Sequence, residues 1–328
     1  MSSIIIGESM IEIITGDDEP THRPGGAFLN TAVALSRLGR HVRFLTDFGT
    51  DYDGSIIRGH LDQNSIQIAT RPESERSEGT ILSWIARVGT GLSPFSYDNI
   101  AFDIPSPPST PTEQLDLDLF APRTALFGSV ACHIPPGDSK VLEWIKLLRE
   151  TSTIFFDPNV RPTITPNLDQ ARERVEECIS YADVVKASEK DVLTLYGSLA
   201  DFDTIARGWL DLGASIVVIT HGFKGSVLYS KSGSRIHIPA QTGNVVDPFG
   251  GGDAYMAALI DCLGRIALDT AAHRDALGKI SDTSLEMLGL FATAGASITI
   301  ERHGPATPTR DELMDRYQLY RSSPHVLS

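Results

Sequence analysis

Cysteine is scarce in this sequence, which has only Cys132, Cys178 and Cys262 among its 328 residues and no C-x-x-C pair. This usage argues against a disulfide framework and a structural zinc site, and it is typical of proteins in a reducing compartment. Residues 1–6 lack the basic segment and the long apolar segment of a signal peptide. We therefore predict a cytoplasmic protein.

The sequence is also poor in positive charge and in long apolar runs. It has 28 Lys and Arg residues against 42 Asp and Glu residues, a net charge of −14. A surface of this sign repels nucleic-acid backbones and anionic lipids. No apolar run approaches the ~18 residues of a membrane-spanning helix. We expect neither a nucleic acid nor a membrane as partner, and a regulatory DNA-binding role is disfavoured for the same reason.

Hydrophobic residues (41%) and charged residues (21%) occur in the proportions of a globular protein. From about residue 124 onward, short apolar runs rich in β-branched residues alternate with segments of helical periodicity. The expected strands are 124–130, 153–156, 183–186 and 215–220, and the expected helices lie around 141–148, 168–180, 188–196 and 203–212. Strands that are apolar throughout are buried on both faces. Their alternation with helices predicts right-handed βαβ units in a parallel sheet.

The first hundred residues follow a different pattern. Residues 3–7 and 42–45 are expected strands that bracket a helix near 27–38, whereas 66–102 alternate polar and apolar residues without a helical period. Such alternation is typical of an antiparallel flap with one wet face. The proline-rich segment 104–111 is an expected hinge or return loop. The sequence therefore predicts one α/β domain over residues 1–328, with a small β lid formed from about 10–24 and 66–104.

The strongest local motif is Asp247-Pro-Phe-Gly-Gly-Gly-Asp253, which directly precedes a helical pattern. Glycines at a helix N-terminus leave backbone N–H groups free to bind an anion, and the helix dipole favours that charge. An aspartate at the same place can accept a proton from a hydroxyl beside the anion. The alternative is a tight turn in which Asp253 is an ordinary N-cap.

The familiar phosphate-binding and hydrolase motifs are missing, namely G-x-x-x-x-G-K-[ST], G-x-G-x-x-G after a strand, H-E-x-x-H and G-x-S-x-G. Four other polar or glycine-rich segments stand out instead, at 25–30, 157–162, 186–191 and 220–226. All four are expected after the carboxyl ends of parallel strands, where open α/β sheets bind their ligands. Their joint placement predicts one binding cleft at that edge of the sheet.

In this combination the sequence resembles the ribokinase-like (PfkB) carbohydrate kinase family, and its fructokinase branch above all, over residues 4–308. Two signatures carry the resemblance: Gly25-Gly26-x-x-x-Asn30 is similar to the N-terminal one, and Asp247–Asp253 is similar to the C-terminal D-T-x-G-A-G-D. Three further segments are similar to fructokinase elements: Asp157-Pro-Asn159-x-Arg161, Thr220-x-Gly222-x-x-Gly225 and, in the lid, Phe95-Ser-Tyr97.

The resemblance implies an ATP-dependent sugar kinase with a three-layer α/β/α domain, a mostly parallel sheet and a β-sheet lid. It implies that Asp253 is the general base and that the amides of Gly250, Gly251 and Gly252 form an anion hole. The implied sugar-binding residues are Glu12, Gly25, Gly26, Asn30, Tyr97 and Arg161. The implied ATP-binding residues are Asn159, Lys186, Ser188, Thr220, Gly222, Gly225 and Ser226. Mg²⁺ would accompany ATP, held largely through water, and the lid edge would support a homodimer.

Several positions depart from the family pattern. Glu12 replaces an Asp, which keeps the carboxylate but changes its reach. Pro248 and Phe249 replace the usual residues beside Asp247, which weakens the case for a monovalent cation such as K⁺ there. Ser188 and Asp191 replace the Asn and Glu of a magnesium-related motif, so metal affinity is expected to differ.

Asp98 stands where relatives that accept sugar acids carry a lid arginine. A carboxylate there would repel an acidic substrate, which favours a neutral hexose. D-Fructose, converted to fructose 6-phosphate, is the leading candidate. 2-Keto-3-deoxygluconate, ribose and nucleosides stay open as substrates, and a non-catalytic sugar or nucleotide sensor on the same fold is the alternative of a different class.

Overall fold

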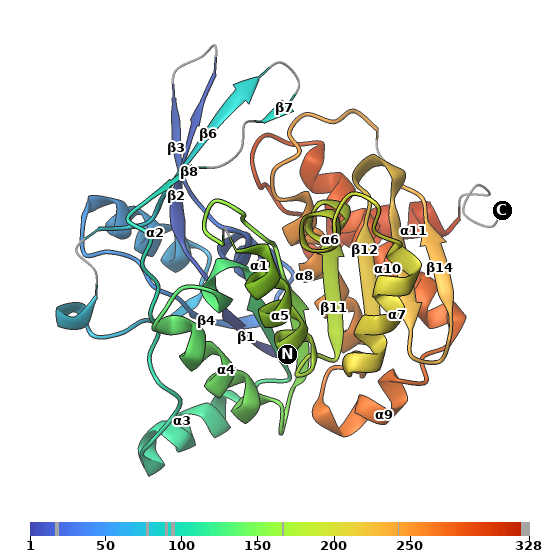
Figure 1. Ribbon diagram of the computed structural model, residues 1–328, viewed down its shortest axis with the longest axis horizontal. Helices are drawn as coiled ribbons and strands as arrows, with labels where there is room; N and C mark the ends of the chain where they lie inside the picture. The colour runs from blue at the N-terminus through green and yellow to red at the C-terminus, as the bar shows by residue number, and fades with distance from the viewer. Residues whose placement is uncertain are drawn as a thin grey trace.

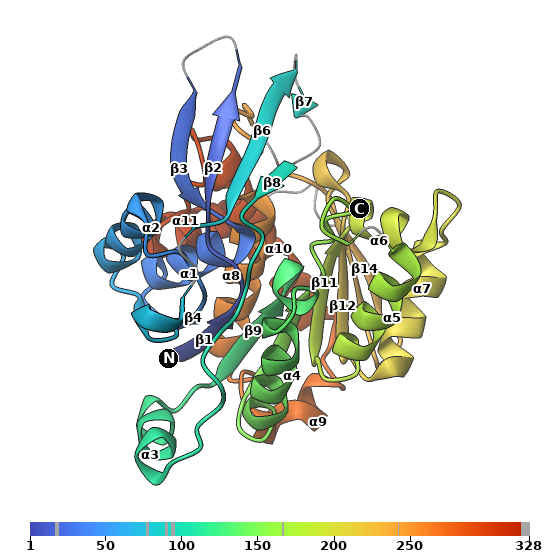
Figure 2. The same cartoon turned by 60° about the vertical axis from the view of Figure 1, so that its left-hand side comes forward.

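Two β-sheets of different size organise the chain (Figures 1 and 2). The computed structural model describes residues 1–16, 20–76, 79–88, 91–92, 96–165, 167–241 and 243–322. Phe95, part of the lid segment that resembles the family, lies outside the described residues.

The large sheet has nine strands in the part of the chain that is described. In spatial order they are β14 (Arg235–Ile238), β13 (Ser226–Ser230), β12 (Ile216–Thr220), β11 (Val184–Ser188), β10 (Thr153–Asp157), β9 (Thr124–Gly128), β1 (Ser2–Ile6), β4 (His41–Leu45) and β5 (Gln67–Ala69). Pairing is parallel from β12 to β5, and β13 and β14 add an antiparallel edge. The parallel sheet predicted from the apolar runs is therefore confirmed.

Alternation of side chains along each strand gives the sheet two separate hydrophobic cores. Ile5 of β1 faces one core, whereas its neighbours Ile4 and Ile6 face the other. All three are fully buried. This explains why the central strands are apolar at consecutive positions.

Helices cover both faces of the sheet. The first face carries α1 (Ala27–Arg37), α2 (Tyr52–Gln63), α8 (Gly251–Arg265), α9 (Arg274–Leu277), α10 (Asp282–Ile300) and α11 (Arg310–Arg321). The second carries α3 (Pro111–Phe120), α4 (Gly137–Leu148), α5 (Leu168–Ile179), α6 (Glu189–Tyr196) and α7 (Phe202–Leu212). Short 3-10 turns are η1 (Glu73–Glu75), η2 (Ser129–Cys132), η3 (Gly222–Lys224) and η4 (Ala271–His273). The expected three-layer α/β/α arrangement is confirmed.

The small sheet projects from one end of the large sheet, as Figure 1 shows. Its strands are β2 (Met10–Thr15), β3 (Thr21–Gly25), β6 (Leu82–Val88), β7 (Gly91–Leu92) and β8 (Ser96–Asp98). It is not purely antiparallel as expected, because β2 and β6 run parallel. The chain passes through the large domain between these two strands, so no hairpin forces them to run in opposite directions.

The second segment of the lid, expected from about residue 66, begins later in the sequence. Residues 67–69 form β5, which pairs in parallel with β4 and so extends the large sheet. The lid strands of this second segment lie within 82–98. Polar–apolar alternation over three residues is compatible with the edge of either sheet, so the pattern alone did not distinguish them.

Helix α10 has the length and mean hydropathy that a membrane-spanning helix would need. Two thirds of that stretch is buried inside the protein, where α10 packs along α8 and α11. Burial of this kind is typical of a core helix, which is apolar because it is surrounded by protein.

Candidate active site

Helix α8 begins at the glycine run, as predicted, and its start contacts Lys186 near the carboxyl end of β11. Gly250 is its N-cap and has φ 77°, in the left-handed region. A Cβ on Gly250 would lie 2.6 Å from the Cβ of Pro305, so this turn requires glycine. Gly251 and Gly252 begin the helix, and amides in the first turn have no acceptor within it. These amides and the helix dipole form a place for an anion.

Asp253 is the third residue of α8 and does not cap it, so the ordinary N-cap alternative is wrong. Its carboxylate Oδ2 instead accepts a hydrogen bond of 2.8 Å from Asn30 Nδ2. This contact joins the two signature segments across 223 residues of sequence. Burial raises the pKa of Asp253 to about 7, although the Asn30 hydrogen bond and the Lys186 ammonium act in the opposite direction. A carboxylate with this pKa is suited to accept a proton near neutral pH.

Lys186, at the end of β11, places a buried cation next to the start of α8. Its Nζ lies 2.8 Å from Asp157 Oδ2 and donates a hydrogen bond of 3.3 Å to the carbonyl oxygen of Gly252. Burial by itself would lower the pKa of Lys186, but the Asp157 carboxylate outweighs it and the pKa is raised. The ammonium therefore stays charged beside the free amides of the first turn, a combination suited to binding a phosphate.

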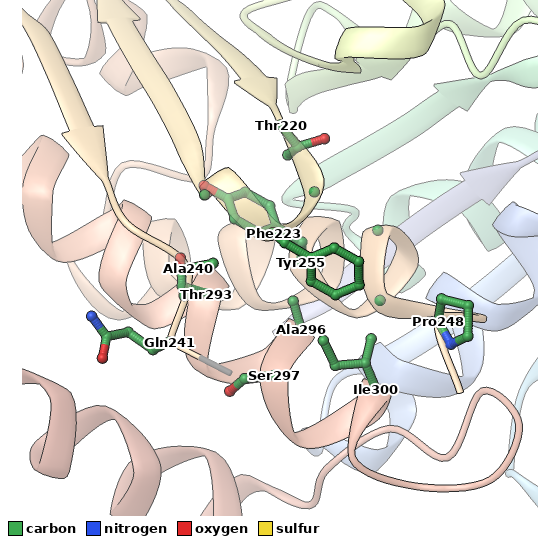
Figure 3. A pocket seen from close by; sticks show the side chains of 14 residues that line it. Thr220, Phe223, Ala240, Gln241, Pro248, Tyr255, Thr293, Ala296, Ser297 and Ile300 are labelled. Atoms are coloured by element: carbon green, nitrogen blue, oxygen red, sulfur yellow. The ribbon is translucent and has the colours of Figure 1, made fainter. Parts of the chain in front are cut away.

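An apolar pocket of about 270 Å³ opens beside these amides (Figure 3). One wall comes from the loop after β12, and the other comes from α8 and α10. The described residues that line it are Thr220, Gly222, Phe223, Gly225, Ala240, Gln241, Pro248, Gly251, Gly252, Tyr255, Thr293, Ala296, Ser297 and Ile300. A pocket that is apolar at one end and reaches free amides at the other suits a nucleotide.

Three of the residues predicted to bind ATP, Thr220, Gly222 and Gly225, line this pocket. Ser226 does not, because it is buried behind the wall and its hydroxyl hydrogen-bonds Tyr255 Oη at 2.9 Å. Tyr255 itself lines the pocket. Ser226 therefore positions Tyr255 rather than lining the cavity.

A second, smaller cavity of about 30 Å³ lies between the lid and the large domain. The described residues that line it are Glu8, Met10, Glu12, Gly26, Ala27, Ser83, Tyr97, Ser129, Val130, Asn159 and Arg161. Four of these, Glu12, Gly26, Tyr97 and Arg161, were predicted to bind the sugar. Asn159 was predicted at the ATP site but lies here. The polar residues that the sequence interpretation missed are Glu8, Ser83 and Ser129.

A sequence signal for Glu8 did exist. It is an acid between two apolar strand patterns, and it precedes Glu12 by four residues. An acid in such a context is rarely buried without a partner or a function.

Glu12 is buried at the base of the lid. Arg23 Nε contacts its Oε2 at 3.0 Å, and the Arg23 guanidinium lies 4.7 Å from the centre of the Phe249 ring. A Cβ on Gly25 would come within 2.3 Å of Glu12 Cδ, so glycine leaves room for this carboxylate. Gly25 ends β3 and Gly26 caps α1, so this segment follows a lid strand and not a parallel strand of the large sheet. The expectation that residues 25–30 follow a parallel strand was therefore wrong, because the residue pattern of a strand does not specify which sheet the strand joins.

Asp98 does not line the small cavity in the described structure, although Tyr97 does. Its Oδ2 accepts a hydrogen bond of 2.7 Å from Trp84 Nε1 on the exposed side of the lid. Neighbouring residues on a strand face opposite sides of the sheet. The repulsion of acidic substrates that the sequence suggested therefore cannot come from Asp98 in this arrangement.

Ser188 and Asp191 form a capping box at the start of α6. Asp191 Oδ2 accepts a hydrogen bond from Ser188 N at 2.9 Å, and its Oδ1 accepts one from Val160 N at 2.8 Å. Oδ1 of Asp191 thus fixes the loop after β10 to α6, and Oδ2 fixes the start of α6. These contacts explain its burial without a metal ion.

Asp247 closes the loop before α8. Its Oδ1 accepts a hydrogen bond from Phe249 N and its Oδ2 accepts one from Gly304 N, both at 3.1 Å. Among the described residues no group of three His, Cys, Asp or Glu side chains could hold a metal ion. A Mg²⁺ ion at this site would rely on phosphate oxygens and water, which suits its reluctance to lose water.

Known proteins resemble this chain in sequence and in fold. Residues 3–312 match the pfkB family of carbohydrate kinases. The chain is 30% identical to a fructokinase of Rhizobium leguminosarum bv. trifolii over 271 residues, which cover 78% of each chain. A fructokinase of Xylella fastidiosa with bound ATP superimposes with a TM-score of 0.80 at 21% identity, covering 98% of this chain and 99% of that one. The aminoimidazole riboside kinase of Salmonella enterica superimposes with a TM-score of 0.74 at 22% identity, covering 97% and 100%.

Proposed function

Because this chain belongs to the pfkB family of carbohydrate kinases, we propose that it transfers the γ-phosphoryl group of ATP to the primary hydroxyl of a neutral sugar. D-Fructose is the first candidate, giving fructose 6-phosphate and ADP. The observation that carries the proposal is the position of Asp253. It follows the anion-binding glycines that line the larger pocket. It is also hydrogen-bonded to Asn30 of helix α1, and the N-terminus of α1 lines the smaller cavity.

The larger pocket supports binding of ATP. Its apolar end suits the base, and the amides of Gly251 and Gly252 suit the phosphates. Lys186 lies beside them and contributes a permanent positive charge. Phosphoryl transfer depends mainly on positioning and charge neutralisation, which these groups supply. Mg²⁺ accompanying ATP would neutralise further phosphate charge.

Asp253 is the group that would accept the proton of the sugar hydroxyl as that oxygen attacks the γ-phosphorus. Asn30 fixes the carboxylate through Oδ2, which leaves Oδ1 for the hydroxyl. The developing negative charge on the transferred group would face the amides at the start of α8. Closure of the lid over the sugar would exclude water, the competing acceptor.

The pH dependence of kcat/KM for the sugar should report the Asp253 carboxylate. Burial raises its pKa to about 7, and only the deprotonated form accepts a proton. We therefore expect kcat/KM to be constant above neutral pH and to fall by at least about tenfold per pH unit below it. Initial rates measured from about pH 5.5 to about pH 8.5 test this, and a profile that stays flat down to about pH 5.5 would contradict it.

The substrate is tested by a panel of sugars with coupled detection of ADP release. The panel includes D-fructose, ribose, 2-keto-3-deoxygluconate and a nucleoside, each at several concentrations. We expect D-fructose to give the highest kcat/KM. If ribose or 2-keto-3-deoxygluconate exceeds it, the fructose assignment is wrong. Sugar binding in calorimetry without ADP formation at saturating Mg-ATP would instead support the sensor.

Arg161→Ala is expected to raise KM for the sugar about tenfold or more, because a hydrogen bond to a charged group contributes ~1.5–3 kcal/mol. Arg161 lines the small cavity, where its guanidinium also interacts with Tyr97. KM for ATP should change much less. Arg161→Lys is the matched control, since it keeps the charge but loses the planar group.

An unchanged sugar KM in Arg161→Ala would assign this side chain to structure. Its Nη1 donates to the carbonyl oxygens of Asn159 and Val160, at 3.3 and 3.1 Å. A purely structural role would then lower the melting temperature without changing KM.

A further inference from the structure

We infer that Glu8 is a specificity-determining residue of the small cavity. Its Oε2 accepts a hydrogen bond from a sugar hydroxyl, and its negative charge disfavours substrates that carry a carboxylate. This inference rests on the proposed function and names the residue by which a neutral sugar is selected.

The position of the Glu8 carboxylate is fixed by a chain of hydrogen bonds. Ser129 Oγ donates to Glu8 Oε1 at 3.0 Å and accepts from Asn159 Nδ2, also at 3.0 Å. Ser129 and Asn159 have φ values of 54° and 38°, left-handed conformations that non-glycine residues seldom adopt. Strain of this kind is concentrated at functional sites, where it holds groups in place. Glu8 is thus oriented by two residues that the fold holds at a conformational cost.

The second oxygen of this carboxylate is left for a ligand. Glu8 is 1% exposed and lines the small cavity. Its Oε2 receives no hydrogen bond of normal geometry from any described residue. Leaving a buried acceptor unsatisfied is costly, and buried polar groups in native proteins almost always have a partner. A hydroxyl of a bound sugar would satisfy this oxygen.

The charges around the cavity favour a neutral ligand. Glu12 is paired with Arg23, and Asp98 is bound by Trp84 outside the cavity, so neither is available to repel a substrate carboxylate. Glu8 and Arg161 both line the cavity and attract each other, which already balances the Arg161 charge. A substrate carboxylate would add a negative charge beside Glu8 in a site with little water.

The charge of Glu8 can also be changed by pH, without a substitution. Burial raises its pKa to about 7, while its own backbone amide, Ser129 and Arg161 act in the opposite direction and Asp253 adds to the rise. Glu8 is therefore expected to lose its charge just below neutral pH. Asp253 titrates in the same range, but it serves every substrate alike, so a ratio of two substrates cancels its effect.

The experiment compares D-fructose with 2-keto-3-deoxygluconate in Glu8→Gln, which keeps the shape and removes the charge. We expect kcat/KM for D-fructose to fall about tenfold or more, because a charge-assisted hydrogen bond is lost. For 2-keto-3-deoxygluconate we expect kcat/KM to rise. The ratio of kcat/KM for the two substrates should therefore shift by more than tenfold toward the sugar acid. Glu8→Asp keeps the charge, and should raise the fructose KM while leaving the ratio close to that of wild type. Glu150→Gln, at an exposed position on the surface, is the control and should change neither value.

Two outcomes separate failure of the inference from failure of the proposed function. If the wild-type enzyme phosphorylates no neutral sugar, the proposed function fails, whatever the variants do. If it phosphorylates D-fructose but the ratio in Glu8→Gln stays within about twofold of wild type, only the inference about Glu8 is overturned. If Glu8→Gln does not fold, the wild-type ratio is measured from about pH 5.5 to about pH 8.5. It should then shift toward the acid as the pH falls, and a constant ratio overturns the inference.

Discussion

Asp253→Asn is expected to lower kcat by about 10²–10⁴-fold, the usual contribution of a general base. Asparagine has nearly the same size as aspartate, and its side-chain oxygen can still accept the hydrogen bond from Asn30 Nδ2. It cannot take a proton from the sugar hydroxyl. KM for ATP and for the sugar should change far less, because the α8 amides and the residues of the small cavity remain.

The stability of Asp253→Asn separates catalysis from structure. Burial raises the pKa of Asp253 to about 7 in the folded protein, above its usual value of 3.8. The stability contributed by a carboxyl with a raised pKa is fully present below its usual pKa of 3.8, decreases as the pH rises above that value, and is lost once the pH passes about 7. Asparagine never ionises and shows no such loss. We therefore expect the melting temperature of the variant to equal that of wild type below about pH 4, to exceed it increasingly as the pH rises to about 7, and to stay above it at higher pH.

Measuring kcat, both KM values and the melting temperature on the same preparation distinguishes the two roles. A purely structural Asp253 would give a less stable variant with nearly normal turnover per folded molecule. Turnover within a factor of about three of wild type would remove Asp253 from the mechanism, because that is far below the effect of a general base.

Gly252→Ala is expected to lower kcat/KM for ATP by about 10²-fold, comparable with the loss of one donor from an anion hole. Gly252 is exposed, and among the described residues, its chain neighbours and the backbone of its own helix apart, Lys186 Nζ at 3.4 Å is the only heavy atom within 4 Å of an added Cβ. The new methyl group would therefore occupy the space between the first-turn amides and the Lys186 ammonium, where we propose that a phosphate binds. The backbone needs no left-handed conformation at this position.

Gly208→Ala is the matched control for this variant. Gly208 is an exposed glycine in helix α7, and a Cβ there meets no described residue within 4 Å apart from its chain neighbours and the backbone of its own helix. Alanine in place of glycine stabilises a helix by about 1 kcal/mol, so neither variant should melt earlier than wild type. Gly208→Ala should keep full activity. If Gly252→Ala is equally active, the anion site does not lie at the start of α8.

Much of the large domain could be predicted from the sequence because its signals are local. Runs such as 216–219 are apolar at every position, which specifies a strand buried on both faces, and here they form most of β12. The three glycines before Asp253 specify a turn into a helix with free amides, and here they begin α8. The carboxyl-edge loops after β10, β11 and β12 follow from the order of strands and helices.

Sheet membership could not be predicted in this way. The short alternating run at 67–69 joins the large sheet as β5, and lid strands β2 and β6 pair in parallel. Hydrogen bonding between strands is a long-range property, and a pattern within one strand carries no information about its partner.

The composition of the candidate site was decided by tertiary structure. Asn30 and Asp253 meet because α1 packs along α8, and nothing in either segment specifies a partner 223 residues away. Glu8 becomes significant only through burial beside Ser129 and Arg161, and Asp98 loses its assigned role because it faces the other side of the lid from Tyr97. Residue type and spacing determined which chemical groups this protein has. The direction, burial and charge surroundings of each side chain depend on packing between segments distant in sequence, so only the folded structure decided which groups share a cavity.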